Sequence, residues 1–338
     1  MKALELASAS PALVGELQSR YGGDDPRLAV EAFGLSFPNP IGLAAGLDKD
    51  GVAIPALAAL GFGSVEVGSV TALPQAGNAR PRLFRLPGDE ALINRMGFNN
   101  QGAAHLAARL ARLDDLPPGD RRRSRVPVGV NVGKSRAVAA ADAEHDYSAA
   151  LRSVWPHADY VVFNVSSPNT PGLRSLQERE PLERLLRVAR ELAGELGPLP
   201  VLVKLSPDLS TEQLKVVADV AQASGAAGLI ATNTTVTRPG LSSPHAEETG
   251  GLSGRPLAEL ASAVLAELVG VTSLPIVSVG GIFTAEDVVD RLRAGAVLVQ
   301  LYTSFVYRGP GLLKSIKGSL VARLDAAGLA SVGALRGG

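Results

Sequence analysis

The stretch VLVKLSPDLSTEQLKVVADVAQASGAAGLIA, residues 201–231, predicts a strand, a helix and a second strand in succession. Val201 to Leu205 is a short apolar run, typical of a strand that is buried on both faces. Ser210 to Gln213 has the pattern of a capping box, and apolar residues then recur at spacings of three and four through Ala223. Gly228 to Ala231 supplies the next strand. A helix between two such strands favours a parallel pair.

The same alternation of strand and helix runs through most of the chain. Eight such repeats predict a (β/α)8 barrel of the α/β class, and the continuous hydrophobicity of the strands favours a parallel arrangement. A chain of 338 residues is long enough for one barrel with a short N-terminal appendage. The expected barrel strands are Ile41 to Ala45, Ser64 to Val70, Val126 to Val132, Tyr160 to Val165, Val201 to Leu205, Gly228 to Ala231, Ile276 to Val279 and Val297 to Leu301.

Two connections are too long to be simple turns between a strand and a helix. They are Thr71 to Gln101 and Asn233 to Pro256, and each comes directly after a predicted strand. Long loops in a compact domain usually carry function or cover a site. Because loops that follow strands emerge at the carboxyl end of a barrel, where active sites lie, we expect both loops at the rim of the site.

The composition excludes several classes of function. Lys plus Arg balances Asp plus Glu at 33 each, so no net positive charge attracts nucleic acid. Cysteine is absent, which rules out disulfides, thiolate zinc sites and a cysteine nucleophile. The four histidines lack the close spacing of metal ligands, so we expect no metal. Without a long apolar run or the layout of a secretory signal, the sequence favours a protein kept inside the cell.

Polar residues follow the predicted strands at their carboxyl ends, as a barrel enzyme requires. In Asn164 to Leu173, a buried strand opens into a loop in which two prolines restrict the backbone and would hold the Ser167 hydroxyl and the Asn169 amide in defined directions. Taken alone, this loop is equally consistent with an ordinary turn. A reaction centre is favoured because the other strand ends carry polar groups as well. These include Lys49, Ser69, Asn131, Lys204, Asn233 and the run Tyr302-Thr303-Ser304.

A glycine pair after the seventh strand is a candidate phosphate site. Gly280-Gly281 is followed by Phe283 to Glu286, which opens a helix, and free backbone N–H groups there can approach a phosphate closely. Gly251 to Gly254 could add a second contact, although turns need glycine in any case. Lys204 lies inside an apolar strand, where an unpaired cation is costly, so we expect it to face a bound anion or an electron-rich ring. Together these features predict a phosphate-bearing cofactor.

Five motifs occur in order and at compatible spacing between Asn39 and Lys317. They are NPIGLAAGLDKDG (39–51), NRMGFNN (94–100), SSPNTPGL (166–173), ATNTT (231–235) and TGGLSGRPL (249–257). The combined signature resembles class 2, quinone-dependent dihydroorotate dehydrogenase. The resemblance implies a TIM barrel that binds one FMN per chain and oxidises (S)-dihydroorotate to orotate in de novo pyrimidine (UMP) biosynthesis, with a membrane quinone as electron acceptor. Class 1 relatives have cysteine where Ser167 stands, and this chain has none.

The resemblance also implies roles for individual residues. Ser167 would be the catalytic base that removes the C5 proton while C6 delivers hydride to the flavin. Amide side chains offer both a donor and an acceptor, which match the ring carbonyl and N–H groups of dihydroorotate. The implied substrate-binding residues are Lys49, Asn94, Arg95, Met96, Gly97, Phe98, Asn164, Asn169, Asn233 and Thr234. The implied FMN-binding residues are Ala45, Gly46, Leu47, Asp48, Lys49, Ser69, Asn131, Asn164, Lys204, Thr232, Gly254, Gly281, Tyr302 and Thr303.

The chain is expected to divide into two parts. Residues 39–338 would form the FMN-binding catalytic barrel, and residues 1–38 a short helical extension, the part that in class 2 docks on the membrane and binds quinone. We expect a monomer attached peripherally to the cytoplasmic side of the cell membrane, or otherwise cytoplasmic, with Arg85 and Tyr302 on the path between flavin and quinone. The alternative is a soluble dihydroorotate dehydrogenase, or another FMN barrel oxidoreductase, with a different acceptor. A non-redox barrel lyase or synthase and a binding protein are more distant alternatives.

Overall fold

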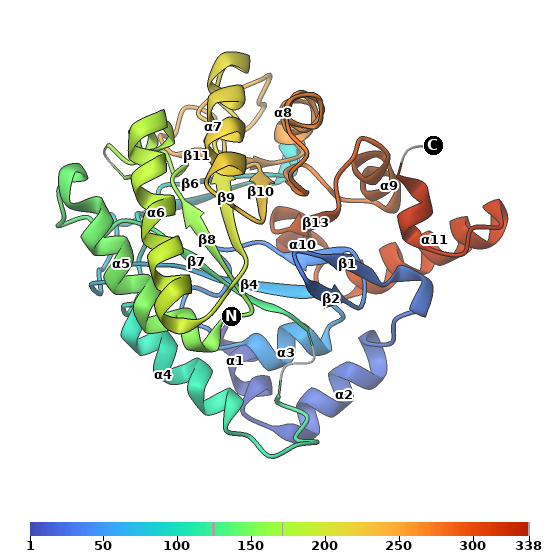
Figure 1. Ribbon diagram of the computed structural model, residues 1–338. Coiled ribbons are helices and arrows are strands. Elements are labelled where there is room, and N and C mark those ends of the chain that lie inside the picture. The colour runs from blue at the N-terminus through green and yellow to red at the C-terminus, as the bar shows by residue number, and fades with distance from the viewer. Residues whose placement is uncertain (124–125, 171, 337–338) are drawn as a thin grey trace.

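Eight parallel strands form a closed barrel that is surrounded by helices (Figure 1). The computed structural model describes residues 1–123, 126–170 and 172–336. Around the barrel the strands follow chain order, and the last one closes onto the first. The (β/α)8 barrel predicted from the sequence is therefore confirmed. The barrel strands are β3 (Ile41–Leu43), β4 (Ser64–Val70), β7 (Val128–Val132), β8 (Tyr160–Asn164), β9 (Val201–Leu205), β10 (Gly228–Ala231), β12 (Ile276–Val279) and β13 (Leu298–Leu301).

Helices follow the strands and cover the outside of the barrel (Figure 1). The capping box expected at Ser210 is present: its hydroxyl accepts a hydrogen bond from the Gln213 N–H at 3.3 Å, and the Gln213 side chain accepts one from the Ser210 N–H at 2.9 Å. The helices are α1 (Lys2–Ser8), α2 (Pro11–Tyr21), α3 (Ile54–Ala59), α4 (Ala103–Asp114), α5 (Ala143–Val154), α6 (Arg179–Leu196), α7 (Thr211–Ala223), α8 (Ala258–Val271), α9 (Ala285–Arg293), α10 (Thr303–Arg308) and α11 (Gly311–Ala327).

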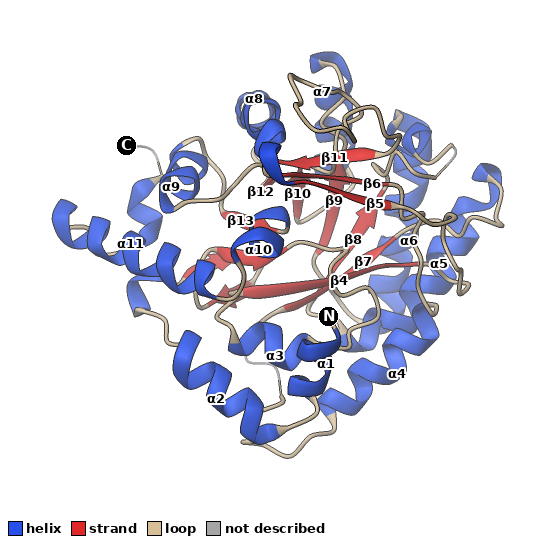
Figure 2. Cartoon of the chain, turned by 180° about the vertical axis from the view of Figure 1, so that it is seen from behind, coloured by secondary structure: helices blue, strands red, loops and turns tan. Residues whose placement is uncertain are grey.

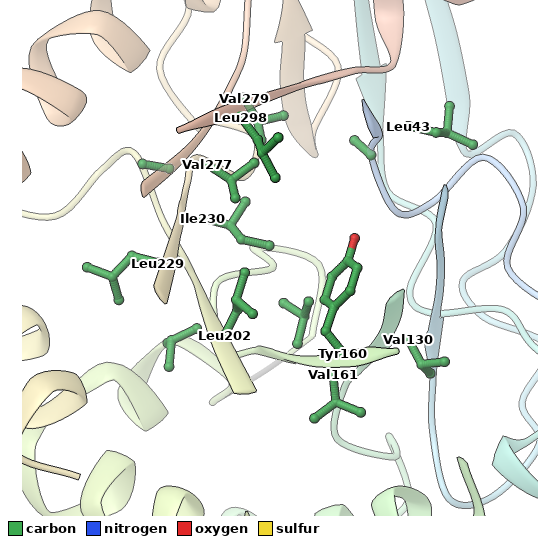
Figure 3. Close-up of a cluster of buried hydrophobic side chains, with 14 of the residues drawn as sticks. Leu43, Val130, Tyr160, Val161, Leu202, Leu229, Ile230, Val277, Val279 and Leu298 are labelled. Carbon is green, nitrogen blue, oxygen red and sulfur yellow. The ribbon is translucent and has the colours of Figure 1, made fainter. Parts of the chain in front are cut away.

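Side chains fill the barrel interior and a hairpin closes its amino end. Figure 3 shows Tyr160 and Val161 on opposite sides of β8, as the period of two in a strand requires. The hairpin consists of β1 (Val30–Ala32) and β2 (Leu35–Phe37). Phe33 and Phe37 meet edge to face, with ring centroids 6.3 Å apart, and line a small cavity together with Tyr160. This hairpin lies within residues 1–38, which the sequence predicts to be a helical extension.

The two long connections pair with each other at the carboxyl end of the barrel. From the first come β5 (Leu83–Leu86) and β6 (Ala91–Asn94), and from the second comes β11 (Gly251–Gly254). They form an antiparallel sheet in the order β11-β6-β5, which we call the cover sheet, and Figure 2 shows its strands side by side. Its buried residues form a small core separate from that of the barrel.

The two N-terminal helices lie on the outside of the barrel beside α3 (Figures 1 and 2). The Ser8 hydroxyl accepts a hydrogen bond from the Ala56 N–H at 3.0 Å, which fastens α1 to α3. Leu6 and Leu13 are exposed on these helices. Within the described ranges of the chain, no helix has the length and hydropathy needed to span a bilayer.

Candidate active site

A cavity opens at the carboxyl end of the barrel, next to the cover sheet. It contains about 990 Å³ of empty space, a volume that includes the open solvent at its mouth. Residues at or just past the carboxyl ends of β3, β4, β8, β9, β10, β12 and β13 line it, and the cover sheet adds Asn94, Ser253 and Gly254. The position is where barrel enzymes place their active sites.

Most residues that the sequence predicted for substrate or cofactor binding meet in this cavity. They come from segments far apart in the chain, and the closed barrel brings their strand ends together. The predicted residues that line the cavity are Ala45, Gly46, Lys49, Ser69, Asn94, Met96, Gly97, Phe98, Asn164, Ser167, Asn169, Lys204, Thr232, Asn233, Thr234, Gly254, Gly281, Tyr302 and Thr303.

Four predicted site residues do not lie in the cavity wall: Leu47, Asp48, Arg95 and Asn131. Leu47 packs against the main core. The Asp48 carboxylate accepts hydrogen bonds from the N–H groups of the two residues before α3, and its burial raises the pKa of Asp48. Arg95 forms an ion pair with Glu248 at 2.7 Å, which links the end of β6 to the loop before β11. The side chains of Leu47, Asp48 and Arg95 therefore contact the protein around the cavity rather than the cavity itself.

Asn164 is the centre of a hydrogen-bond network beneath the cavity. Its amide nitrogen donates to the Ser69 hydroxyl at 2.8 Å and to the Asn131 carbonyl oxygen at 3.1 Å. Its carbonyl oxygen accepts from the Ser166 hydroxyl at 3.2 Å and from the Asn233 amide at 3.2 Å. Four strand ends, those of β4, β7, β8 and β10, are joined in this way, so the orientation of each amide is fixed before a ligand binds. Such preorganisation lowers the cost of binding.

Ser167 lines the cavity and is only 7% exposed. Its hydroxyl oxygen accepts a hydrogen bond from the Asn169 N–H at 3.3 Å. Pro171, the second proline of this loop, lies outside the described residues. In the part of the chain that the structure describes, the Ser167 hydroxyl has no hydrogen bond to a carboxylate or a histidine. The described residues therefore offer no hydrogen-bonded carboxylate or histidine to take a proton from this hydroxyl.

Lys49 is one of two lysines that line the cavity. Its ammonium group donates a hydrogen bond to the Gly46 carbonyl oxygen at 3.0 Å. Burial lowers the pKa of Lys49 to about 8, and the nearby Arg82 acts in the same direction, whereas Asp50 raises it. Lys49 is therefore largely charged at neutral pH, and a bound anion would stabilise that charge further.

Lys204 lies deeper in the same cavity and has a buried partner. Its ammonium nitrogen is 3.8 Å from the Glu66 carboxylate, which is fully buried on β4. Glu66 also accepts hydrogen bonds from the Asn131 amide at 2.8 Å and from the Gln300 amide at 2.6 Å. The sequence predicts that Lys204 faces a bound group, because an unpaired cation inside an apolar strand is costly. In the structure Lys204 lies in the cavity wall and is also paired with the Glu66 carboxylate.

The candidate phosphate site differs from the expectation at the N-terminus of α9. Thr284 and Asp287 form a capping box at the start of α9, and the Asp287 carboxylate accepts hydrogen bonds from the N–H groups of Phe283 and Thr284. The N–H groups of Phe283, Thr284 and Asp287 are therefore already occupied by side chains of this capping box. The glycine pair Gly280-Gly281 lies outside the box and lines the cavity.

Comparison with known proteins agrees with this geometry. A family model described as dihydroorotate dehydrogenase matches residues 27–324. The chain belongs to the dihydroorotate dehydrogenase family. Curated members named dihydroorotate dehydrogenase (quinone) include a protein of Leifsonia xyli, 54% identical over 91% of this chain and 89% of its own length. Another, from Thermosynechococcus vestitus, is 51% identical over 92% of this chain and 85% of its own. The resemblance inferred from the motifs is confirmed.

Solved dihydroorotate dehydrogenase structures share the fold. A ligand-free DHODH from Eimeria tenella is 39% identical and superimposes with a TM-score of 0.87, covering 98% of both chains. A complex of the Eimeria enzyme with ferulenol gives a TM-score of 0.88 at 38% identity and covers 95% of this chain and 92% of that one.

Four polar residues of the site were not among the predicted binding residues. Ser253, Gln300 and Ser304 line the cavity, and Glu66 lies behind it. The sequence did contain a signal for Glu66, because a carboxylate inside the apolar run of β4 is costly unless it is paired. Gln300 is likewise a polar residue inside the apolar run of β13, where it needs a hydrogen-bond partner. Ser304 is 1% exposed and comes directly after two predicted residues.

Proposed function

We propose that this chain oxidises (S)-dihydroorotate to orotate with bound FMN and passes the electrons to a quinone, as a step of pyrimidine biosynthesis. Family membership supports the reaction and the class. The observation that carries the assignment to this cavity is the meeting of Ser167, four asparagine amides and Lys204 around one cavity. A serine in place of a cysteine agrees with the quinone-dependent class.

The residues of the cavity fit FMN. One buried polar atom of the cavity wall, Ser304 Oγ, has no hydrogen-bond partner within the described residues, which indicates that a bound polar group completes it. Lys204 would neutralise negative charge on the isoalloxazine ring, and Gly254, Gly281 and Thr303, which line the same cavity, would hold the phosphate. When bound, FMN would accept hydride from C6 of the substrate and release the electrons to the quinone.

The side chains of the cavity perform the remaining steps. Asn94, Asn169 and Asn233 would bind the carbonyl and N–H groups of the dihydroorotate ring, and Lys49 its carboxylate. Ser167 would take the proton from C5 and release a proton to water. Asn169 orients this hydroxyl through its backbone N–H. The cover sheet closes over the substrate and limits access of bulk water.

Residues 1–38 would serve as the contact with the membrane and residues 39–338 as the catalytic barrel. The exposed Leu6 and Leu13 on α1 and α2 support a peripheral contact with the cytoplasmic side of the cell membrane. The chain would act as a monomer. Tyr302 lines the cavity, and Arg85, on the edge strand of the cover sheet, stacks on Tyr307 at 5.9 Å. Both would lie near the route from flavin to quinone.

The acceptor is tested by reoxidation of the reduced enzyme. Anaerobic enzyme reduced with one equivalent of dihydroorotate is mixed in a stopped-flow instrument with a soluble quinone, fumarate or NAD⁺. We expect fast return of the flavin absorbance with the quinone alone. Fast reoxidation by fumarate or NAD⁺, with none by quinone, would instead support a soluble dihydroorotate dehydrogenase with another acceptor.

A further inference from the structure

Arg291 on α9 is a buried cation whose role the proposed reaction leaves unexplained. It is 4% exposed. Its guanidinium group donates hydrogen bonds to neutral oxygens, namely the Ser278 hydroxyl at 3.1 Å and the carbonyls of Ala258 at 2.8 Å and Gly280 at 3.0 Å. Within the described residues, no carboxylate forms an ion pair with it, since Asp287 of the same helix pairs with Arg255 at 3.1 Å. A buried charge without a counter-charge is costly unless something else compensates it.

The contacts of Arg291 determine the orientation of the glycine pair. The peptide bond between Gly280 and Gly281 is trans, and in a planar trans peptide the carbonyl and the N–H point in opposite directions. Because the Gly280 carbonyl faces the guanidinium group, the Gly281 N–H faces away from it. Gly281 lines the cavity, and its N–H makes no hydrogen bond within the described part of the chain.

The same guanidinium group ties two walls of the cavity together. Its bond to the Ala258 carbonyl holds the start of α8, directly after Leu257, which lines the cavity. Gly281 packs so closely against this helix that an added Cβ would lie 2.4 Å from Ala258, and its φ of +73° also favours glycine. Arg291 itself is not in the cavity wall, so it acts through these neighbours. Burial lowers the pKa of Arg291, while Asp287 and Asp290 raise it.

We propose that Arg291 is a positioning residue for the phosphate of the cofactor: it holds the Gly281 N–H toward the phosphate and places a positive charge behind it. This inference rests on the proposed function, in which FMN binds in this cavity. A free N–H and a buried cation on one side of the cavity favour a dianion over a neutral group. Riboflavin, which lacks the phosphate, therefore provides the matched comparison ligand.

The test compares the binding of the two flavins by the wild type, by two variants of Arg291 and by one control variant. Full-length protein freed of flavin is titrated with FMN and with riboflavin, and binding is followed by quenching of flavin fluorescence. For Arg291→Met we expect FMN affinity to fall about 10-fold to 100-fold, with riboflavin affinity unchanged. Arg291→Lys, which keeps the charge but loses the fork of donors, should recover part of the loss. Arg293→Met, an exposed arginine of the same helix, should change neither affinity.

Equal losses for FMN and riboflavin in Arg291→Met would overturn the inference, because a merely structural role weakens both. If Arg291→Met does not fold, the same comparison with Arg291→Lys decides. A wild-type protein that binds neither flavin would contradict the proposed function itself. A wild-type protein that prefers FMN, with the same preference in the variants, would contradict the role of Arg291 alone.

Discussion

Glu66 and Lys204 lie on separate strands of the barrel, with the carboxylate 3.8 Å from the ammonium nitrogen and both side chains buried. Asn131 and Gln300 donate their amides to the same carboxylate, so one buried anion organises three neighbours. Lys204, Asn131 and Gln300 together therefore stabilise the buried Glu66 carboxylate. Removing it would leave the cation and two amide donors unsatisfied.

We predict that Glu66→Ala destabilises the fold by about 3–5 kcal/mol, the usual cost of breaking a buried pair from one side. Urea denaturation of the variant measures this change. Glu259→Ala, at an exposed position of α8, is the matched control and should change the free energy of unfolding by less than about 0.5 kcal/mol. A variant as stable as the wild type would show that the network contributes little.

Ser167→Ala should slow flavin reduction by dihydroorotate about 10²-fold to 10⁴-fold, the usual contribution of a general base, while FMN stays bound. Single-turnover absorbance measurements report the rate, and the flavin content reports binding. Ser175→Ala is the control, since Ser175 is exposed and its hydroxyl donates only to the Gly172 carbonyl. Near-normal reduction in Ser167→Ala would show that another group removes the proton.

Lys49 should make substrate binding depend on pH. Burial lowers its pKa to about 8, so the ammonium form is present below that pH and is lost above it. Because the protonated form attracts the carboxylate of dihydroorotate, kcat/KM should fall as the pH rises through about 8. In Lys49→Met, kcat/KM should be low and lack this step. A profile with the same step in the variant would assign the titration to another group.

Variants of Arg95 and Glu248 distinguish an indirect role of Arg95, through its ion pair with Glu248, from direct contact between Arg95 and the substrate. If Arg95 acts through its ion pair, Arg95→Met and Glu248→Gln should each raise KM, and the double variant should be no worse than either single one. Steady-state kinetics of the four proteins measure this coupling. Purely additive effects, or an effect of Arg95→Met alone, would favour the direct substrate contact implied by the sequence resemblance.

The barrel could be predicted because buried parallel strands appear as continuous apolar runs. All eight predicted runs contain a barrel strand, and the helix after Ser210 begins at its capping box. The site followed from the same reasoning, since the topology places every strand end at one rim. Ser167 and Lys204, predicted from two different strand ends, do line one cavity.

What the sequence did not show depends on contacts between distant segments. The strands of the hairpin and the cover sheet have three or four residues each, too few for a clear alternation. The pairing of Asn94 with Gly251 joins two loops that carry no local sign of each other. The partner of Glu66 and the capping of α9 by Asp287 are likewise visible only in three dimensions.

The absorbance of the purified protein during anaerobic addition of dihydroorotate tests the central claim most directly. We predict a yellow protein with one FMN per chain, whose flavin band bleaches on addition of dihydroorotate and whose mixture contains one equivalent of orotate. A preparation that stays colourless after incubation with FMN, or a bound flavin that dihydroorotate does not bleach, would contradict the account.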